Sequence, residues 1–167
     1  MPRLSSMRGF TLIELMIILI LLSIVVGIAI PNMTRLIRNH QIETQAQTLN
    51  GLLQLARTEA VVRRTSVSLN NNGNAWSVST GGQNLRTETF DPEQATIASN
   101  PSPVDITFLY NGSAMVNNAP NQLTTFTFCH DNNPIFAYQL TVQPSGHSRL
   151  HPRGKKSDGT DLGDCNP

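Results

Sequence analysis

An apolar run of 21 residues, Phe10–Ile30, constrains this chain more than any other feature of its sequence. Only Thr11, Glu14 and Ser23 carry polar side chains within the run. As a helix, at about 1.5 Å per residue, it would span roughly 31 Å, which is enough to cross the hydrocarbon core of a bilayer. We therefore expect a membrane-spanning helix in this part of the chain.

The rest of the chain is far more polar than this run. Of the 65 apolar residues among the 167, 17 lie in the run, whereas 45 of the 137 residues after Ile30 are apolar and 50 are Asn, Gln, Ser or Thr. This length suits one domain. The balance of 12 Lys and Arg against 11 Asp and Glu excludes a uniformly basic nucleic-acid protein and an acidic disordered one.

The carboxylate of Glu14, near the start of the run, helps to decide whether the run is a cleaved signal or an ordinary membrane anchor. A cleaved secretory signal would use Arg3 and Arg8 as its basic region and Gly27–Ala29 as its small-residue site. The run is longer than the apolar part of such a signal, however, and Glu14 is a charge that such a part does not tolerate. An isolated charged side chain in a membrane helix costs about 2.5–3.5 kcal/mol. An ordinary anchor is therefore also a poor explanation, unless a cation meets Glu14.

The residues Gly9-Phe10-Thr11-Leu12-Ile13-Glu14 resemble the processing signal of type IV prepilins, a G-F-T-L-x-E pattern followed by a long apolar segment. The resemblance implies that a prepilin peptidase removes a leader, residues 1–9, by cleaving after Gly9. It also implies methylation of the new amino terminus at Phe10. Residues 10–30 would then be both the transmembrane helix and the assembly helix.

The same resemblance gives Glu14 a role in assembly. A buried carboxylate is tolerable where a buried ammonium group meets it, and the amino terminus of a neighbouring subunit would supply that group. The implied partners are other major and minor pilins in a helical fibre. Before assembly the resemblance implies a single-pass protein of the inner membrane with a periplasmic domain, and after assembly an extracellular pilus.

Helical periodicity resumes after the run. Apolar residues recur every three or four positions and form one stripe: Ile42, Ala46, Leu49, Leu53, Ala56 and Ala60. Pro31 lacks the N–H that a continuing helix needs, so it either loosens the helix or ends it. Gly51 weakens a helix by roughly 1 kcal/mol relative to alanine. We expect residues 31–64 to form an amphipathic continuation of the helical spine whose stripe packs on a sheet.

Residues 65–167 show the period of two that is typical of half-buried strands. A first pair, residues 66–69 and 75–79, flanks an Asn-rich turn. Further strands are expected at residues 104–110, 114–116, 123–129, 135–143 and 148–151. Residues 80–103, with two adjacent glycines and three prolines, are expected to form a loop with at most one short strand. The expected fold class is α+β, a long N-terminal hydrophobic helix packed on a small antiparallel β-sheet domain.

Four segments in this half of the chain carry a narrower resemblance: Leu55–Val61 (LARTEAV), Val67–Leu69 (VSL), Phe108–Gly112 (FLYNG) and Val142–Gly146 (VQPSG) before Arg149. Together they resemble the GspH/FimT family of minor pilins and pseudopilins, which implies a type IV pilin-like fold. The paired cysteines near the carboxyl end look most like the FimU-type members of type IVa pilus systems.

The sequence shows no pattern for catalysis or for a metal. The four histidines are accompanied by no G-x-S-x-G, H-E-x-x-H, P-loop or dinucleotide motif. A zinc site at Cys129-His130 and Cys165 would lack a fourth ligand, and adjacent ligands point apart on a strand. We expect no enzyme activity, no metal and no cofactor.

Cys129 and Cys165 predict a disulfide, because the signal exports the domain to an oxidising compartment; two free thiols are the alternative.

All four Lys and Arg residues beyond residue 86 lie close together near the carboxyl end: Arg149, Arg153, Lys155 and Lys156, with His147 and His151 beside them. Three aspartates follow, so a solvated loop is one interpretation. The other is a patch that contacts DNA phosphates. The FimT side of the family implies DNA capture through a G-R-x-R motif. The corresponding residues here are Gly146-His147-Ser148-Arg149, in which a histidine replaces the first arginine.

We interpret the chain as a minor pilin of a type IV pilus. Such a subunit helps pilus assembly and initiation, and it serves adhesion, twitching motility or DNA uptake in natural transformation. One alternative is a GspH-like pseudopilin of type II secretion. Another is a DNA-binding competence pilin that acts through the basic carboxyl-terminal segment. A third is an anchored binding module unrelated to fibres.

Overall fold

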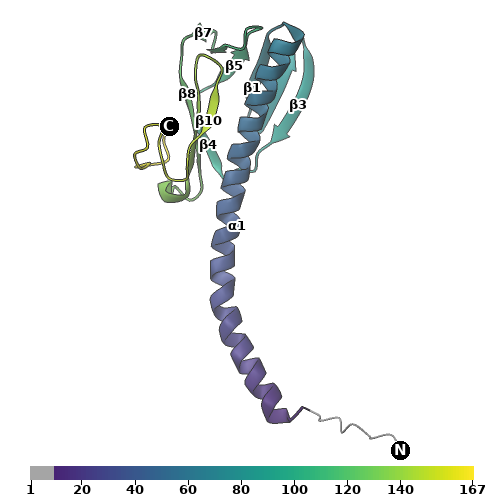
Figure 1. Ribbon diagram of the computed structural model, residues 1–167, viewed down its shortest axis with the longest axis vertical. Helices are drawn as coiled ribbons and strands as arrows, with labels where there is room; N and C mark the ends of the chain where they lie inside the picture. Colours follow the sequence, from purple (N-terminus) through teal and green to yellow (C-terminus); the bar gives the residue numbers. More distant parts are fainter. Residues whose placement is uncertain (1–9) are drawn as a thin grey trace, which may run out of the picture. The chain divides into compact units, whose positions relative to one another are not determined.

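A computed structural model describes residues 10–167, so the leader with Gly9 lies outside the described residues. Within them, one long α helix, α1 (Leu12–Arg63), is followed by ten strands and one 3₁₀ helix, η1 (Pro134–Phe136) (Figure 1). The chain forms two compact units. The first ends at Ile37 and the second comprises Arg38–Pro167.

Helix α1 begins directly after Thr11, whose hydroxyl accepts a hydrogen bond of 3.3 Å from the backbone N–H of Glu14. This bond caps the helix, because it satisfies one of the N–H groups that the first turn leaves unpaired. The helix then runs without interruption through Pro31 and Gly51. Of the two outcomes considered for Pro31, the alternative that it ends the helix is therefore wrong. The helix ends where Arg64 adopts a left-handed conformation with φ of 53°.

The second part of α1 supplies one wall of the core. All six residues of the predicted apolar stripe are buried, at 0–2 % exposure, which confirms the stripe. Leu52 joins them. The outward positions between them are polar, so the helix presents one apolar side to the strands.

Six antiparallel strands form the larger sheet, in the order β3-β2-β1-β5-β6-β7. Their bounds are β1 Val67–Asn72, β2 Ala75–Thr80, β3 Gln83–Thr89, β5 Asp105–Phe108, β6 Ala114–Val116 and β7 Ala119–Pro120. Strand β1 lies at the centre, with Leu69 opposite both Val78 and Ile106. These three side chains are buried and share the face that meets the core.

Four further strands form a separate sheet, in the order β10-β9-β8-β4. Their bounds are β4 Thr96–Asn100, β8 Thr124–Cys129, β9 Tyr138–Val142 and β10 Ser148–Leu150. Phe126 and Phe128 of β8 and Leu140 of β9 are fully buried. Trp76 of the six-stranded sheet contacts Phe126 edge-on, with ring centroids 5.6 Å apart, so the two sheets and α1 share one core.

The structure corrects two expectations about the strands. The antiparallel strands form two sheets, whereas one small sheet was expected. Residues 80–103 contain two strands, β3 and β4, where at most one was expected. Both are edge strands, and no residue of β3 is fully buried, although Leu85 packs against the core. An edge strand with a single apolar residue has no alternation of apolar and polar residues, so the pattern that identifies strands is absent there.

One arginine links the turns of both sheets to α1. The Nε of Arg57 donates to the carbonyl of Gly112, at 3.1 Å, and an Nη donates to the carbonyl of Ser145, at 3.2 Å. Gly112 belongs to the β5–β6 turn, and Ser145 to the β9–β10 turn. The two turns touch: a Cβ on Gly146 would lie 1.9 Å from the carbonyl oxygen of Gly112.

This contact predicts that Gly146→Ala destabilises the second unit strongly. The φ of +77° alone costs about 1–2 kcal/mol for a residue with a Cβ, and the clash with the Gly112 carbonyl adds to that. Gly159→Ala is the matched control, since its φ is +85° but its Cβ would meet nothing within 4 Å. Urea unfolding of residues 38–167 should show a clearly lower midpoint for Gly146→Ala than for Gly159→Ala. Equal midpoints would contradict the contact.

Candidate functional site

The N-terminal part of α1 is apolar on every side. From Phe10 to Ile37, the large apolar side chains of the described residues are 43–77 % exposed. Among residues 10–167, this is the one helix long and apolar enough to cross a membrane. A helix that is apolar all round needs lipid or other helices as its surroundings.

Phe10 and Glu14 lie at the start of this helix. Phe10 precedes the first turn and is 74 % exposed, while Glu14 belongs to the first turn. Its backbone N–H bonds the hydroxyl of Thr11. The sequence Thr-x-x-Glu is a capping signal that the sequence analysis missed. Cleavage after Gly9, methylation of Phe10 and the assembly role of Glu14 remain predictions.

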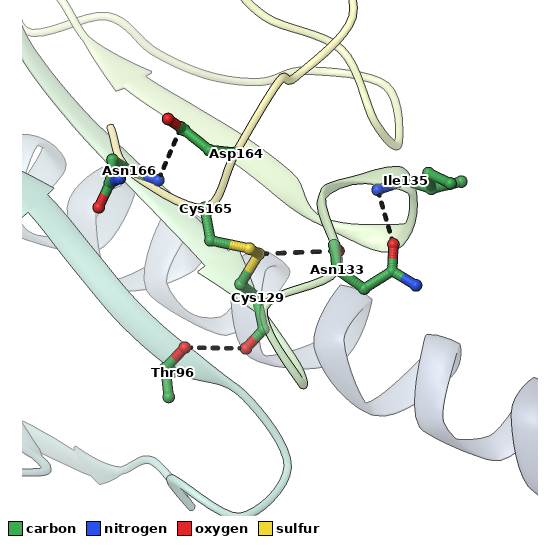
Figure 2. The surroundings of a disulfide bond; sticks show 7 residues. All are labelled: Thr96, Cys129, Asn133, Ile135, Asp164, Cys165 and Asn166. Carbon is green, nitrogen blue, oxygen red and sulfur yellow. Dashed lines mark hydrogen bonds between the residues drawn. A yellow bond between two sulfur atoms is a disulfide. The ribbon is translucent and has the colours of Figure 1, made fainter.

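Cys129 and Cys165 are bonded in the structure, with their Cα atoms 5.9 Å apart (Figure 2). Cys129 is the last residue of β8 and is 2 % exposed. Its carbonyl accepts a hydrogen bond of 3.0 Å from the hydroxyl of Thr96 on β4. The bond therefore attaches the carboxyl-terminal tail to a strand that is itself fixed inside the four-stranded sheet.

Few other contacts hold the tail. Leu162 is buried at 5 % exposure, in a small cluster with Ala137 and the two cysteines. The N–H of Leu162 donates to the carbonyl of Gly154, and the N–H of Ser157 donates to the side-chain oxygen of Gln139. One apolar side chain and a few hydrogen bonds leave most of the anchoring to the disulfide.

Removing the disulfide should therefore loosen the tail. In the chain-entropy model, closing the loop between Cys129 and Cys165 stabilises the fold by about 4 kcal/mol, which is an upper figure for a real disulfide. We expect Cys129→Ser, Cys165→Ser and the double variant to lose the same stability, up to that amount, in urea unfolding. Reduced wild type serves as the control and should match them. Two reactive thiols in the exported, non-reduced protein would contradict the bond.

A buried polar group lies on the face of the four-stranded sheet that carries Arg149. Thr141 and Arg149 are paired across β9 and β10, and the imidazole Nε2 of His151 lies 2.9 Å from the hydroxyl of Thr141. His151 is 4 % exposed. Burial lowers the pKa of His151, and Arg149 lowers it further. His151 is therefore neutral at pH 7 and does not extend the basic segment.

This histidine predicts a loss of stability in mild acid. Its pKa is lower in the folded chain than in the unfolded chain, so its contribution is fully present above about pH 6.5 and declines as the pH falls below that value. His151→Gln keeps a hydrogen-bonding group for Thr141 but does not titrate. Urea unfolding at pH 7.5 and pH 5.5 should show a larger drop for wild type than for this variant. His147→Gln, which changes an exposed histidine, should keep the wild-type drop.

The other basic residues near the carboxyl end do not share one partner or one site. Lys155 Nζ lies 2.7 Å from Asp161 Oδ1. The guanidinium of Arg153 lies over the Phe136 ring, 5.5 Å from its centroid. Arg149, Arg153, Lys156 and His147 are exposed. The structure thus leaves three exposed Lys and Arg residues in this segment without a carboxylate within salt-bridge distance among residues 10–167.

Comparisons with known proteins agree with this architecture. The family "Type II transport protein GspH" matches residues 45–146, and a prokaryotic N-terminal methylation motif matches residues 4–30. The type II secretion system protein H of Pseudomonas aeruginosa is 31 % identical over 71 residues. That match covers 42 % of this chain and 41 % of the relative, so the chain spans about two fifths of the relative's length.

Two solved structures share the fold. The type IV minor pilin FimU of Pseudomonas aeruginosa matches with a TM-score of 0.64 and 23 % identity, over 75 % of this chain and 96 % of FimU. The minor pseudopilin EpsH of Vibrio cholerae matches with a TM-score of 0.51 and 15 % identity, over 69 % of this chain and 99 % of EpsH. The family match extends over more than half of the chain. The chain therefore belongs to the family of type II transport protein GspH.

Proposed function

We propose that this protein is a minor pilin of a type IV pilus. A prepilin peptidase cleaves it after Gly9, the new amino terminus at Phe10 is methylated, and residues 10–30 hold the chain in the inner membrane. The chain then enters a fibre by packing this helix among the helices of other pilins. The β-rich unit is periplasmic before assembly and lies on the extracellular pilus afterwards.

The observation that carries this proposal is an exposed apolar helix with one carboxylate in its first turn. A plain anchor gains nothing from a charge at this place. In a bundle of such helices, the carboxylate of Glu14 meets the amino terminus of a neighbour, and both charges are then compensated. The methylation motif over residues 4–30 supports the same arrangement.

A GspH-like pseudopilin of type II secretion is the alternative. The sequence relative named above belongs to such a system. The fold is more similar to the minor pilin, with a TM-score of 0.64 against 0.51 for the pseudopilin. We favour the pilus on this ground, with assembly and its initiation as the primary role and adhesion or twitching motility as its consequence.

Fractionation separates the two systems. Pili sheared from cells should contain the chain, and its deletion should reduce piliation and twitching while leaving protein secretion intact. Loss of secretion with normal piliation would assign the chain to a secretion pseudopilus. An uncleaved Gly9–Phe10 bond in the mature protein would instead indicate an anchored module unrelated to fibres.

Glu14 allows a sharper test, because its two roles respond differently to substitution. Glu14→Gln keeps the polar group suited to a capped first turn but removes the charge. We expect Glu14→Gln and Glu14→Ala to insert into the membrane normally and to enter sheared fibres poorly. Ser23→Ala is the matched control, since the Ser23 hydroxyl bonds within the helix to the carbonyl of Ile20. Assembly of Glu14→Gln at the wild-type level would show that the charge is not needed.

DNA binding during uptake is a second candidate function. The exposed side chains of Arg149, Arg153 and Lys156 favour it, since all lie within one short segment. Lys155 is engaged by Asp161 at 2.7 Å, so it would have to break an ion pair before it could reach a phosphate. Any binding would read phosphates and carry little base information.

Three phosphate contacts predict a slope of about −2.7 for log K against log salt on duplex DNA, while four would give about −3.6. Titration of residues 38–167 with duplex DNA at low salt should show weak binding of arbitrary sequences. Arg149→Gln with Lys156→Gln should abolish this binding, whereas Arg86→Gln, on strand β3 of the other sheet, should preserve it. Unchanged binding by the double variant would place the site elsewhere, and no binding by wild type would leave the segment a solvated tail.

A further inference from the structure

The chain contains three Asn-Gly dipeptides, which begin at Asn50, Asn72 and Asn111. An asparagine before a glycine can lose its side-chain amide without an enzyme, because the backbone nitrogen of the glycine attacks the side-chain carbonyl carbon of the asparagine. Glycine favours this ring closure, since it has no Cβ to obstruct the approach. A folded chain permits the reaction only where the glycine N–H, the asparagine amide and the backbone between them are free to move.

The first dipeptide is held inside α1. Gly51 lies in the interior of the helix, where each N–H donates to a carbonyl of the preceding turn. The side-chain oxygen of Asn50 accepts a hydrogen bond of 2.7 Å from the hydroxyl of Ser148 on β10. Ring closure at Asn50 would therefore break the helix and its bond to the four-stranded sheet together.

The third dipeptide is held in the β5–β6 turn. The N–H of Gly112 donates to the carbonyl of Leu109, at 2.8 Å, and the carbonyl of Gly112 accepts from the Nε of Arg57. The side-chain oxygen of Asn111 accepts two hydrogen bonds from Ser113, of 3.0 Å from its N–H and of 2.7 Å from its hydroxyl. Both reacting groups are thus engaged, and Gly112 is buried.

The second dipeptide lies at the tip of the β1–β2 hairpin. Asn72 is the last residue of β1, Gly73 follows it in the turn, and both residues are exposed. Among residues 10–167, the N–H of Gly73 donates to no other backbone group, and the side-chain amide of Asn72 makes no hydrogen bond. The N–H of Phe90 donates to the carbonyl of Asn74, at 2.9 Å. This bond restrains the turn but occupies neither reacting group.

Local opening at this tip disturbs little of the core. Asn72 pairs with Ala75 alone, because β5 does not extend to this end of β1. The next pair joins Asn71 to Trp76, whose side chain is 2 % exposed and fixed in the core. The exposed end of a hairpin opens at a smaller free-energy cost than the core. The backbone can therefore rotate at Asn72 while the rest of the unit stays folded.

We propose that Asn72 is a site of spontaneous deamidation in the folded protein, with water as the co-reactant, and that Asn50 and Asn111 are protected from it. The nitrogen of Gly73 forms a bond to the side-chain carbon of Asn72, and the proton of the Gly73 N–H leaves with the amide group as ammonia. Water then opens one carbonyl of the resulting succinimide and leaves an aspartate or an isoaspartate. Either carboxylate is ionised at neutral pH, so each conversion adds one negative charge to a chain with a formal net charge of +1.

The isoaspartate product also changes the hairpin. Its backbone passes through the former side-chain carbon and gains one methylene group before Gly73. The pair between Asn72 and Ala75 then loses its register, while the pair between Asn71 and Trp76 keeps its place in the core. Because the amide is not restored, the modified fraction grows with the age of the folded chain, whichever fibre the chain enters.

Peptide mass analysis of the full-length protein tests this site. The chain is kept in detergent at mildly alkaline pH in heavy-oxygen water, so that deamidation before digestion carries the label. The same chain, reduced and unfolded in guanidinium chloride, shows how fast each dipeptide reacts without the fold. Asn72→Gln slows the reaction, because its ring closure needs a larger ring. Asn71→Gln is the matched control, since Asn71 is also exposed but the residue after it has a Cβ.

We expect the label in the folded chain to accumulate at Asn72 at least severalfold faster than at Asn50 or Asn111. In the unfolded chain all three should react at comparable rates. Asn72→Gln should strongly reduce the acidic form seen on isoelectric focusing, and Asn71→Gln should leave it at the wild-type level. Comparable labelling of Asn72 and Asn111 in the folded chain, or equal protection of all three relative to the unfolded chain, would overturn the proposal.

Discussion

The burial of one stripe of α1 is the interaction on which the second unit depends. The two sheets touch through Trp76 and Phe126, but each has an apolar face that needs a second layer, and besides α1 the described residues form only the three-residue helix η1. The stripe from Ile42 to Ala60 provides that layer and belongs to one cluster with residues of both sheets. Hydrogen bonds hold α1 to the same two sheets. Arg57 donates to carbonyl groups in a turn of each sheet, and the hydroxyl of Ser148 on β10 donates to the side-chain oxygen of Asn50. The helix is thus the element that makes two sheets into one folded unit.

The same helix has two kinds of surroundings along its length. Up to Ile37 its exposed residues are mostly apolar, and beyond Arg38 they are mostly polar. The first part suits lipid or a bundle of helices, and the second part suits water on one side and strands on the other. A continuous backbone between these parts lets one element act both as the anchor in the membrane and as the core of the unit in the periplasm. This dual use explains why the helix is much longer than the core requires.

The sequence predicts the helical elements better than the sheets, for physical reasons. The stripe of α1 was predictable because burial against strands imposes a period near 3.6 on its apolar residues. The paired strands β1 and β2 were predictable because their buried face alternates with a solvated one. Strand β3 carried no such signal, since it is an edge with Leu85 as its one apolar residue. The division into two sheets depends on which strands pair over long separations, and no local pattern records that. The cap at Thr11 does have a local signal, because Thr-x-x-Glu before an apolar run marks the start of a helix.

The face of the four-stranded sheet that carries Arg149 shows why the carboxyl end of this chain is covalently attached. Thr127 pairs with Gln139 and Thr125 pairs with Thr141 on this face, so it is lined by polar side chains, three of which are buried at 0–5 % exposure. A tail that packs on such a face gains little from the hydrophobic effect, which scales with the apolar area removed from water. Hydrogen bonds replace those made with water and contribute modestly. The disulfide stabilises the attached tail in another way, because it lowers the entropy of the unfolded chain and does not require an apolar surface. The tail therefore needs a disulfide because the polar face on which it packs provides little hydrophobic stabilisation.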